Sequence, residues 1–262
     1  MQFVVSASTD LGAKKHVNED SLFVRSIRAG RERMVFAVLC DGMGGLSRGE
    51  MASASLIHAF SEWMNSSLPR LVCKQPEESA IQTQWNALVT RMNERIKEYG
   101  RRRNVSLGTT AIALLVMQRR YIAMNVGDSR LYEIADDIRQ ITSDQTVLAR
   151  EVALGSISPQ EALSDPRRHV LLQCVGASDV VAPDFYSGET KPDTVYLLCS
   201  DGFRNEITPG EIHSALGPAR ATGQAQMREA ALKLIALNKK RNEKDNISVI
   251  TIRTYPSEGA PC

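Results

Sequence analysis

An apolar run stops abruptly at an aspartate in Met34-Val-Phe-Ala-Val-Leu-Cys-Asp41-Gly42-Met43-Gly44-Gly45. Seven apolar residues bounded by a turn signal are typical of a strand that is buried on both faces. The glycines let the chain turn tightly, so the Asp41 carboxylate and a neighbouring peptide oxygen can face one small space. Such oxygens are the ligands that hard divalent cations prefer. An Asp-Gly pair is also a common turn, so this site alone does not establish a metal centre.

Three more aspartates stand where a strand starts or stops. They are found in Val195-Tyr-Leu-Leu-Cys-Ser200-Asp201-Gly202, in Ile122-Ala-Met-Asn-Val126-Gly127-Asp128, and in Asp245-Asn246-Ile-Ser-Val-Ile-Thr-Ile252. We expect all four carboxylates to converge at one sheet edge and to bind two or more Mg²⁺ or Mn²⁺ ions. Zinc is a poor candidate because the histidines and cysteines show no ligand spacing. A paired-metal site acidifies a water molecule for attack on phosphorus and needs no protein nucleophile.

Composition places the chain among globular proteins. Its 262 residues and 43% hydrophobic content suit one large or two small domains with a sizeable core. A net charge of +2 indicates neither a nucleic-acid nor a membrane partner. The five cysteines are scattered, which favours a reducing compartment. The N-terminus lacks signal-peptide features and no stretch reaches the roughly 18 apolar residues of a membrane span, so we expect a soluble cytoplasmic protein.

The periodicity of apolar residues predicts mostly antiparallel strands separated by long helices. The chain therefore reads as one α+β domain over residues 1–254, with helices covering the faces of the sheets, and a frayed tail over 255–262. Residues 143–154 have helical spacing and Ser158 begins a short helix with a capping-box pattern. The insert 145–168 has few large apolar residues, which is typical of a mobile surface subdomain.

The polar loop between the first two strand-like runs carries a cation and two adjacent carboxylates, Lys15, Glu19 and Asp20. It could be a solvated hairpin loop. Glu19 and Asp20 point to opposite sides of an extended chain, so at most one is expected to bind a metal directly. The other would act through water or orient a neighbour.

Two other hydrolytic chemistries are weaker candidates. Gly45-Leu-Ser47-Arg-Gly49 matches the G-x-S-x-G elbow of serine hydrolases, but the strand ends at Cys40, several residues too early. Cys199 and Arg204 are one residue too close for the Cys-x5-Arg loop of cysteine phosphatases. Neither a Walker A pattern nor G-x-G-x-x-G occurs, so nucleotide binding has no motif support.

Six motifs in order resemble those of the bacterial metal-dependent protein phosphatases of the protein phosphatase 2C type. They are Lys15-x-x-Asn-Glu19-Asp20, Asp41-Gly-Met-Gly-Gly45 with Gly49-Glu-x-Ala-Ser53, Gly108-Thr-Thr110, Asn125-Val-Gly-Asp128-Ser-Arg130, Ser200-Asp201-Gly202, and Asp245-Asn246-Ile-Ser. The resemblance covers about residues 5–252. It implies a four-layer α-β-β-α sandwich of two antiparallel sheets, and hydrolysis of phosphoserine and phosphothreonine in proteins.

The resemblance also implies residue roles. Asp41 bridges two Mn²⁺ or Mg²⁺ ions, the Gly42 carbonyl joins the second ion, and Asp201 and Asp245 hold the first. Asp128 would take a third ion together with Asp201. Glu19 and Asp20 would act through metal-bound waters, and residues 145–168 with Pro166-Arg-Arg-His169 look like the family's flap.

Two positions depart from the family's usual pattern, and a third differs from the animal relatives as it does in many bacterial members. Lys15 stands where a phosphate-binding arginine is usual, Gln145 where histidine is frequent, and Met43 where animal relatives have histidine. The alternative function is a catalytically weak regulator that binds phosphoproteins, and Lys15 is its only sequence support. Bacterial relatives often pair with a serine/threonine kinase, so such a kinase is an expected partner.

Overall fold

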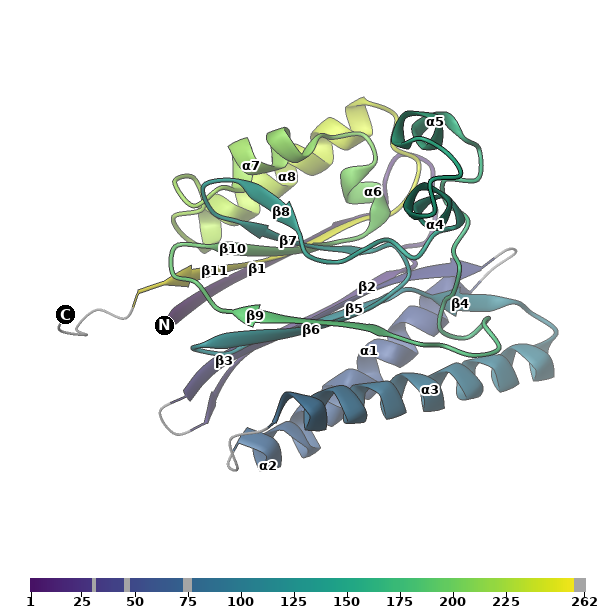
Figure 1. Ribbon diagram of the computed structural model, residues 1–262, viewed down its shortest axis with the longest axis horizontal. Coiled ribbons are helices and arrows are strands. Elements are labelled where there is room, and N and C mark those ends of the chain that lie inside the picture. The colour runs from purple at the N-terminus through teal and green to yellow at the C-terminus, as the bar shows by residue number, and fades with distance from the viewer. Residues whose placement is uncertain (30–31, 45–47, 73–76, 257–262) are drawn as a thin grey trace.

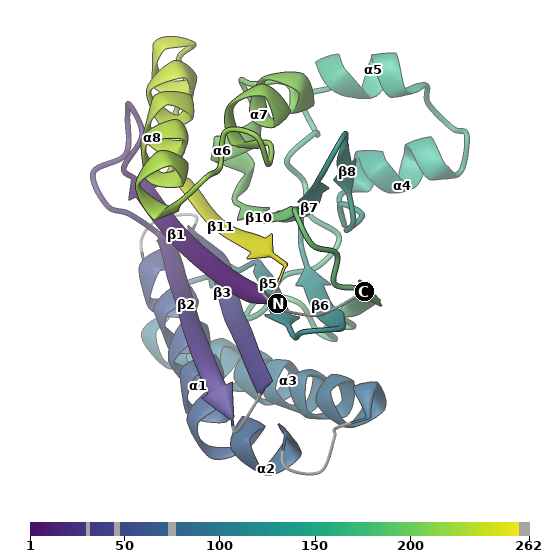
Figure 2. The same cartoon turned by 90° about the vertical axis from the view of Figure 1, so that its left-hand side faces the viewer.

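The expected four-layer α+β sandwich is confirmed in a computed structural model that describes residues 1–29, 32–44, 48–72 and 77–256. Two antiparallel sheets lie face to face, and each carries helices on its outer side (Figure 1). The quarter-turned view separates the helical layer of α7 and α8 from that of α1 and α3 (Figure 2).

The first sheet has the strand order β1-β11-β10-β7-β8 and the second β2-β3-β5-β6-β9, with β4 paired to β3. All pairings are antiparallel. The bounds are β1 Gln2–Asp10, β2 Asp20–Ala29, β3 Glu32–Gly44, β4 Leu107–Thr109, β5 Ala111–Val116, β6 Arg120–Val126, β7 Arg130–Ile134, β8 Ile138–Gln140, β9 Asp184–Glu189, β10 Val195–Cys199 and β11 Ile247–Tyr255.

The helices fall into two outer layers and one projecting pair. Those packed on the second sheet are α1 Gly49–Ser66, α2 Leu68–Val72 and α3 Glu78–Arg103. Those on the first sheet are α6 Asp201–Arg204, α7 Pro209–Leu216 and α8 Gln224–Lys240. The projecting pair, α4 Val147–Ala153 and α5 Pro159–Ser164, lies at the end of the sandwich opposite the two chain ends (Figure 1).

Each interface between layers has its own apolar core. Phe36, Trp63 and Trp85 pack ring against ring between the second sheet and its helices, with centroids 5.4 to 5.7 Å apart. A central core joins the two sheets and includes Leu39 and Ile250. The strands between two cores are buried on both faces, which explains their continuous apolar runs. Among the described helices, none is long and apolar enough to cross a membrane.

Several element boundaries differ from the sequence-based expectation. Strand β3 continues through Asp41 to Gly44, because β4 extends the ladder by pairing Gly42 with Thr109. The helix expected over 143–154 begins only at Val147, since Thr146 caps it with its side chain and also bridges to Leu171. Of the predicted tail 255–262, residues 257–262 lie outside the described residues.

Candidate metal centre

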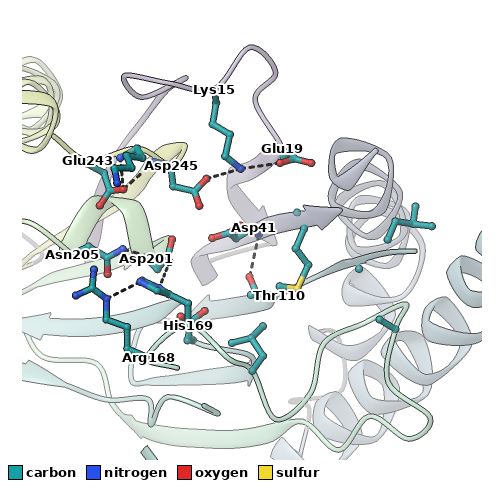
Figure 3. A pocket seen from close by; sticks show the side chains of 18 of the residues that line it. Lys15, Glu19, Asp41, Thr110, Arg168, His169, Asp201, Asn205, Glu243 and Asp245 are labelled. Carbon is teal, nitrogen blue, oxygen red and sulfur yellow. Dashed lines mark hydrogen bonds and ion pairs between the residues drawn. The ribbon is translucent and has the colours of Figure 1, made fainter. Parts of the chain in front are cut away.

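The four strand-end aspartates meet at one cavity of about 740 Å³. Asp41 comes from the second sheet, Asp201 and Asp245 flank strands of the first, and Asp128 lies in the turn between β6 and β7. Lys15, Glu19 and Gly42 also line the cavity. Figure 3 shows the labelled side chains Asp41, Asp201 and Asp245 pointing toward a common space. The cavity therefore opens where the two sheets meet.

The backbone of Asp41 is fixed by two neighbouring threonines. The Thr110 hydroxyl accepts a hydrogen bond from the Asp41 N–H at 3.0 Å. The Asp41 carbonyl accepts from the Thr109 hydroxyl at 3.0 Å and from the Thr110 N–H at 2.8 Å. With these contacts satisfied by β4 and the residue after it, the carboxylate is left for other partners.

Gly42 lies where three chain segments cross, and only a glycine fits there. A Cβ on Gly42 would come within 2.4 Å of the Gly49 carbonyl oxygen and 2.5 Å of the Glu19 carbonyl oxygen. The Gly42 N–H donates to that same Glu19 oxygen at 3.1 Å. Close packing thus explains the glycine that follows the aspartate.

Asp20 and Asp41 are directly opposite each other on β2 and β3. Burial, followed by the charges of Asp20, Asp201, Asp128 and Asp245, raises the pKa of Asp41 well above its usual value. Burial likewise raises the pKa of Asp20 to about 7, although the Ser200 hydroxyl donates to its Oδ2 at 3.0 Å. The ionised carboxylates repel one another, and a divalent cation would relieve that repulsion.

This repulsion predicts how the stability of the metal-free protein depends on pH. The folded pKa of Asp20 is raised above its unfolded value, so stability is greatest below about pH 4 with respect to this group and is lost as pH rises to about 7. Asp20→Asn should remove about 2 kcal/mol of the destabilisation between pH 5 and pH 8. Urea unfolding in chelator at several pH values measures this. Asp136→Asn, at an exposed turn, is the matched control, and equal pH slopes in wild type and Asp20→Asn would contradict the assignment.

Asp201 begins helix α6 and is ionised more readily than its neighbours. Burial opposes ionisation, but hydrogen bonding to His169, the Arg204 charge and Asn205 together lower the pKa of Asp201. The Asp201 Oδ2 lies 3.4 Å from His169 Nδ1 and 3.4 Å from Asn205 Nδ2. Its Oδ1 is buried and has no protein partner among the described residues. One Asp201 oxygen is therefore held by protein and the other is free for an ion.

Lys15 links two of the expected functional carboxylates. Its Nζ is 3.0 Å from Glu19 Oε2 and 3.0 Å from Asp245 Oδ1 (Figure 3). Burial lowers the pKa of Lys15, but the bonds and charges of Asp245 and Glu19 outweigh burial and raise it overall. The other Glu19 oxygen accepts from the Gly49 N–H at the start of α1, so protein groups engage both oxygens of Glu19.

The hypothesis that Lys15 binds substrate phosphate predicts a loss of activity when Lys15 is replaced. Losing one charge-assisted hydrogen bond predicts a fall in kcat/KM of roughly ten- to a hundredfold for Lys15→Ala. Lys15→Arg should retain activity, because a guanidinium can make two parallel contacts with phosphate oxygens. Steady-state kinetics with Lys14→Ala as the exposed neighbouring control decides this. Unchanged kcat/KM in Lys15→Ala would leave Lys15 as a loop lysine.

The residues at the cavity fit a hydrated divalent cation. Within the described ranges, no three His, Cys, Asp or Glu side chains are arranged to hold an ion by themselves. Mg²⁺-type sites commonly use one or two carboxylates and several waters, which suits this more open arrangement. The buried Asp201 Oδ1 has no partner among the described residues, and burial with the neighbouring carboxylates raises the pKa of Asp41, so a bound ion would stabilise both groups. Asp20 itself does not line the cavity, so its role through water stays a prediction.

Several contacts at the site were missed by reasoning from sequence. The motif pattern assigned no partner to His169, which contacts Asp201, and none to Arg204, which contacts Asp128. Asn246 ties the Lys15 loop down by donating to the carbonyls of Leu11 and Val17, both at 3.1 Å. Its place directly after Asp245 was the available signal, because asparagine often bonds to nearby backbone.

The competing nucleophiles do not gain support. Gly45–Ser47 of the G-x-S-x-G match lie outside the described residues. The three described cysteines, Cys40, Cys174 and Cys199, are buried. Burial raises the pKa of each thiol, that of Cys199 to about 12, so none readily forms a nucleophilic thiolate.

Comparison with known families agrees with this geometry. The family model described as Protein phosphatase 2C matches residues 12–234, most of the chain. The chain belongs to the protein phosphatase 2C family. Among curated family members, the serine/threonine phosphatase stp of Listeria innocua is 27% identical over 247 residues, covering 93% of each chain.

Solved structures of protein phosphatase 2C-type enzymes share the fold. The serine/threonine phosphatase of S. agalactiae superposes with a TM-score of 0.85 at 25% identity, covering 97% of this chain and 100% of that one. The catalytic domain of PstP, solved in complex with 2 manganese ions, gives a TM-score of 0.77 at 27% identity, covering 97% and 100%. The family expected from the motifs is thus confirmed.

Proposed function

We propose that the protein is a metal-dependent phosphatase that hydrolyses phosphoserine and phosphothreonine in protein substrates. Its relatives carry the name serine/threonine phosphatase. The observation that carries the proposal is the convergence of Asp41, Asp201 and Asp245 on one open cavity. No observation favours the alternative of a catalytically weak binding module, because such a module gains nothing from buried carboxylates that repel one another.

Some residues of the site would hold metal ions, and others would bind the substrate. Asp41, Gly42, Asp201 and Asp245 would hold Mn²⁺ or Mg²⁺. Bound ions supply the positive charge that acidifies water and offsets the charge of the phosphate. Lys15 stands at the cavity and offers its ammonium to the phosphate oxygens, while Glu19 keeps Lys15 in place. Thr109 of β4 and Thr110 directly after it would keep the Asp41 backbone from shifting when substrate binds.

We also infer that residues 1–254 act as one domain and that residues 145–168 form a flap beside the cavity. Arg168, the last residue of that segment, and His169, directly after it, line the cavity. Arg167 forms ion pairs with both Asp165 and Glu151, and these connect the C-terminal end of the flap to helix α4. Phosphorylated proteins are the proposed substrates, and an opposing serine/threonine kinase is the proposed partner.

The substrate class can be tested directly. Purified protein with Mn²⁺ should release phosphate from phosphothreonine and phosphoserine peptides and much more slowly from a phosphotyrosine peptide of the same sequence. Asp41→Asn is the inactive control. Release from none of the three peptides, with bound Mn²⁺ verified, would overturn the proposed function.

A further inference from the structure

Asp128 differs from the other aspartates of the cavity because an arginine holds it. Arg204 Nη2 donates to the Asp128 main-chain carbonyl at 3.1 Å and lies 3.3 Å from Asp128 Oδ2. The exposed fractions of these side chains are only 13% for Arg204 and 7% for Asp128. An ion pair so shielded from water is screened little by salt and holds its geometry.

Arg204 is itself held by a second carboxylate. Its Nη2 lies 3.5 Å from Asp144 Oδ2, and Arg130 grips Asp144 with two parallel bonds of 2.8 and 2.7 Å. Arg130, Asp144, Arg204 and Asp128 therefore form a chain of alternating charge. Two positive and two negative groups cancel, so this cluster needs no additional cation.

Within the described ranges, no arginine contacts the other cavity carboxylates: Asp245 pairs with Lys15, and Asp201 contacts His169. No ion pair to Asp41 or Asp20 is found among the described residues, and Asp245 shares its lysine with Glu19. Asp201 keeps a buried oxygen that nothing in the described chain satisfies. Asp41 and Asp20 thus have no cationic side chain beside them in the described part of the chain, whereas Asp128 has Arg204.

We propose that Arg204 is a built-in cation for Asp128, so that Asp128 is a positioning residue and not a metal ligand. The inference rests on the proposed metal-dependent function and removes Asp128 from the ligand set that the family resemblance implies, which leaves Asp41, Gly42, Asp201 and Asp245. Arg204 closes helix α6, which Asp201 begins, so the same contact fixes the Asp128 turn against the helix that presents Asp201. The positive charge beside Asp128 is then supplied by the Arg204 guanidinium, which cannot dissociate as a bound metal ion can.

Removing the guanidinium should convert this place into a metal site. The two carboxylate oxygens that now contact one nitrogen, those of Asp128 and Asp144, would face the vacated space. Asp144 would keep Arg130, but Asp128 would become a buried carboxylate with no cationic partner among the described residues, and such a group attracts a cation strongly. The number of bound ions, and not only the reaction rate, should therefore change when Arg204 is replaced.

The test counts bound Mn²⁺ by equilibrium dialysis and electron paramagnetic resonance in wild type, Asp128→Asn, Arg204→Gln and the double variant. Wild type and Asp128→Asn should bind the same number of ions. Arg204→Gln should bind one more, and the double variant should lose it. One ion fewer in Asp128→Asn than in wild type would overturn the inference, as would an unchanged count in folded Arg204→Gln.

Two further measurements keep the result interpretable. Arg204→Lys keeps a positive charge beside Asp128 and should retain the wild-type ion count. If any substitution of Arg204 changed the count by loosening the fold, Arg204→Lys would change it too. If Arg204→Gln does not fold, the comparison of Asp128→Asn with wild type still decides. A wild-type protein that binds no Mn²⁺ would instead refute the proposed metal-dependent function.

Discussion

Asp41→Asn is expected to lower kcat by at least about a thousandfold while leaving the protein folded. Asp41 would hold metal ions at the cavity where the two sheets meet. Loss of its carboxylate therefore removes several kcal/mol of stabilisation of the transition state. The metal-free variant should also be more stable than wild type at pH 8. The amide carries no charge to repel Asp20, which lies directly opposite on β2. Assays with saturating Mn²⁺ and urea unfolding in chelator measure the two effects.

The combination of lower activity and higher stability separates a metal ligand from a structural aspartate. A turn residue that merely supports the fold would lose stability when replaced. Asp137→Asn, on the exposed connection between β7 and β8, is the matched control and should change neither quantity. Wild-type turnover in Asp41→Asn would show that Asp41 has only a structural role in strand β3.

Removal of divalent ions should abolish phosphate hydrolysis completely and reversibly. Sites with few protein oxygens and several waters bind such ions loosely, so activity should return at Mn²⁺ or Mg²⁺ concentrations near the millimolar range. The ion should also stabilise the fold by about 2.7 kcal/mol at a hundred times its dissociation constant. Thermal unfolding with and without Mn²⁺, alongside activity, measures both.

The stabilisation by Mn²⁺ should depend on pH in a defined direction. Because burial raises the pKa of Asp20 to about 7 and that of Asp41 well above its usual value, protons compete with the ion at low pH. Added Mn²⁺ should therefore stabilise the protein more at pH 8 than at pH 5, and should stabilise Asp41→Asn little at either. Full activity in excess chelator would rule out the metal requirement.

The sequence predicted the strands and the convergence of the aspartates where one pattern, an apolar run ending at an aspartate, determines both. Apolar runs such as Val35–Cys40 can only be buried strands, and an aspartate at the end of such a run is placed at a sheet edge by geometry. It failed where tertiary contacts override a weak local pattern. Strand β9 has the sequence Asp-Phe-Tyr-Ser-Gly-Glu, and none of its residues is fully buried. Its extended conformation is stabilised by pairing with β6.

The pairing of distant side chains was equally beyond the sequence. Arg204 and Asp128 are 76 residues apart, and nothing local marks them as partners. Gln145 was noted only as a substitution for histidine. In the structure its Oε1 accepts from the Gly127 N–H at 2.8 Å and its Nε2 donates to Asp184 at 2.7 Å, so it holds the turn that carries Asp128. Such contacts require the completed fold before they can be recognised.

The pairing of β1 with β11 has a practical consequence for experiments on this protein. Asp10 faces Ile247 near the cavity, whereas Gln2 faces Tyr255 at the far end of the same ladder. Nine residues of extended strand separate these ends by about 30 Å. An affinity tag, fluorophore or surface linker attached before Gln2 or after Tyr255 would thus leave the cavity open to phosphoproteins. A substrate tethered at either terminus would need a linker able to span that distance before it could reach the ions.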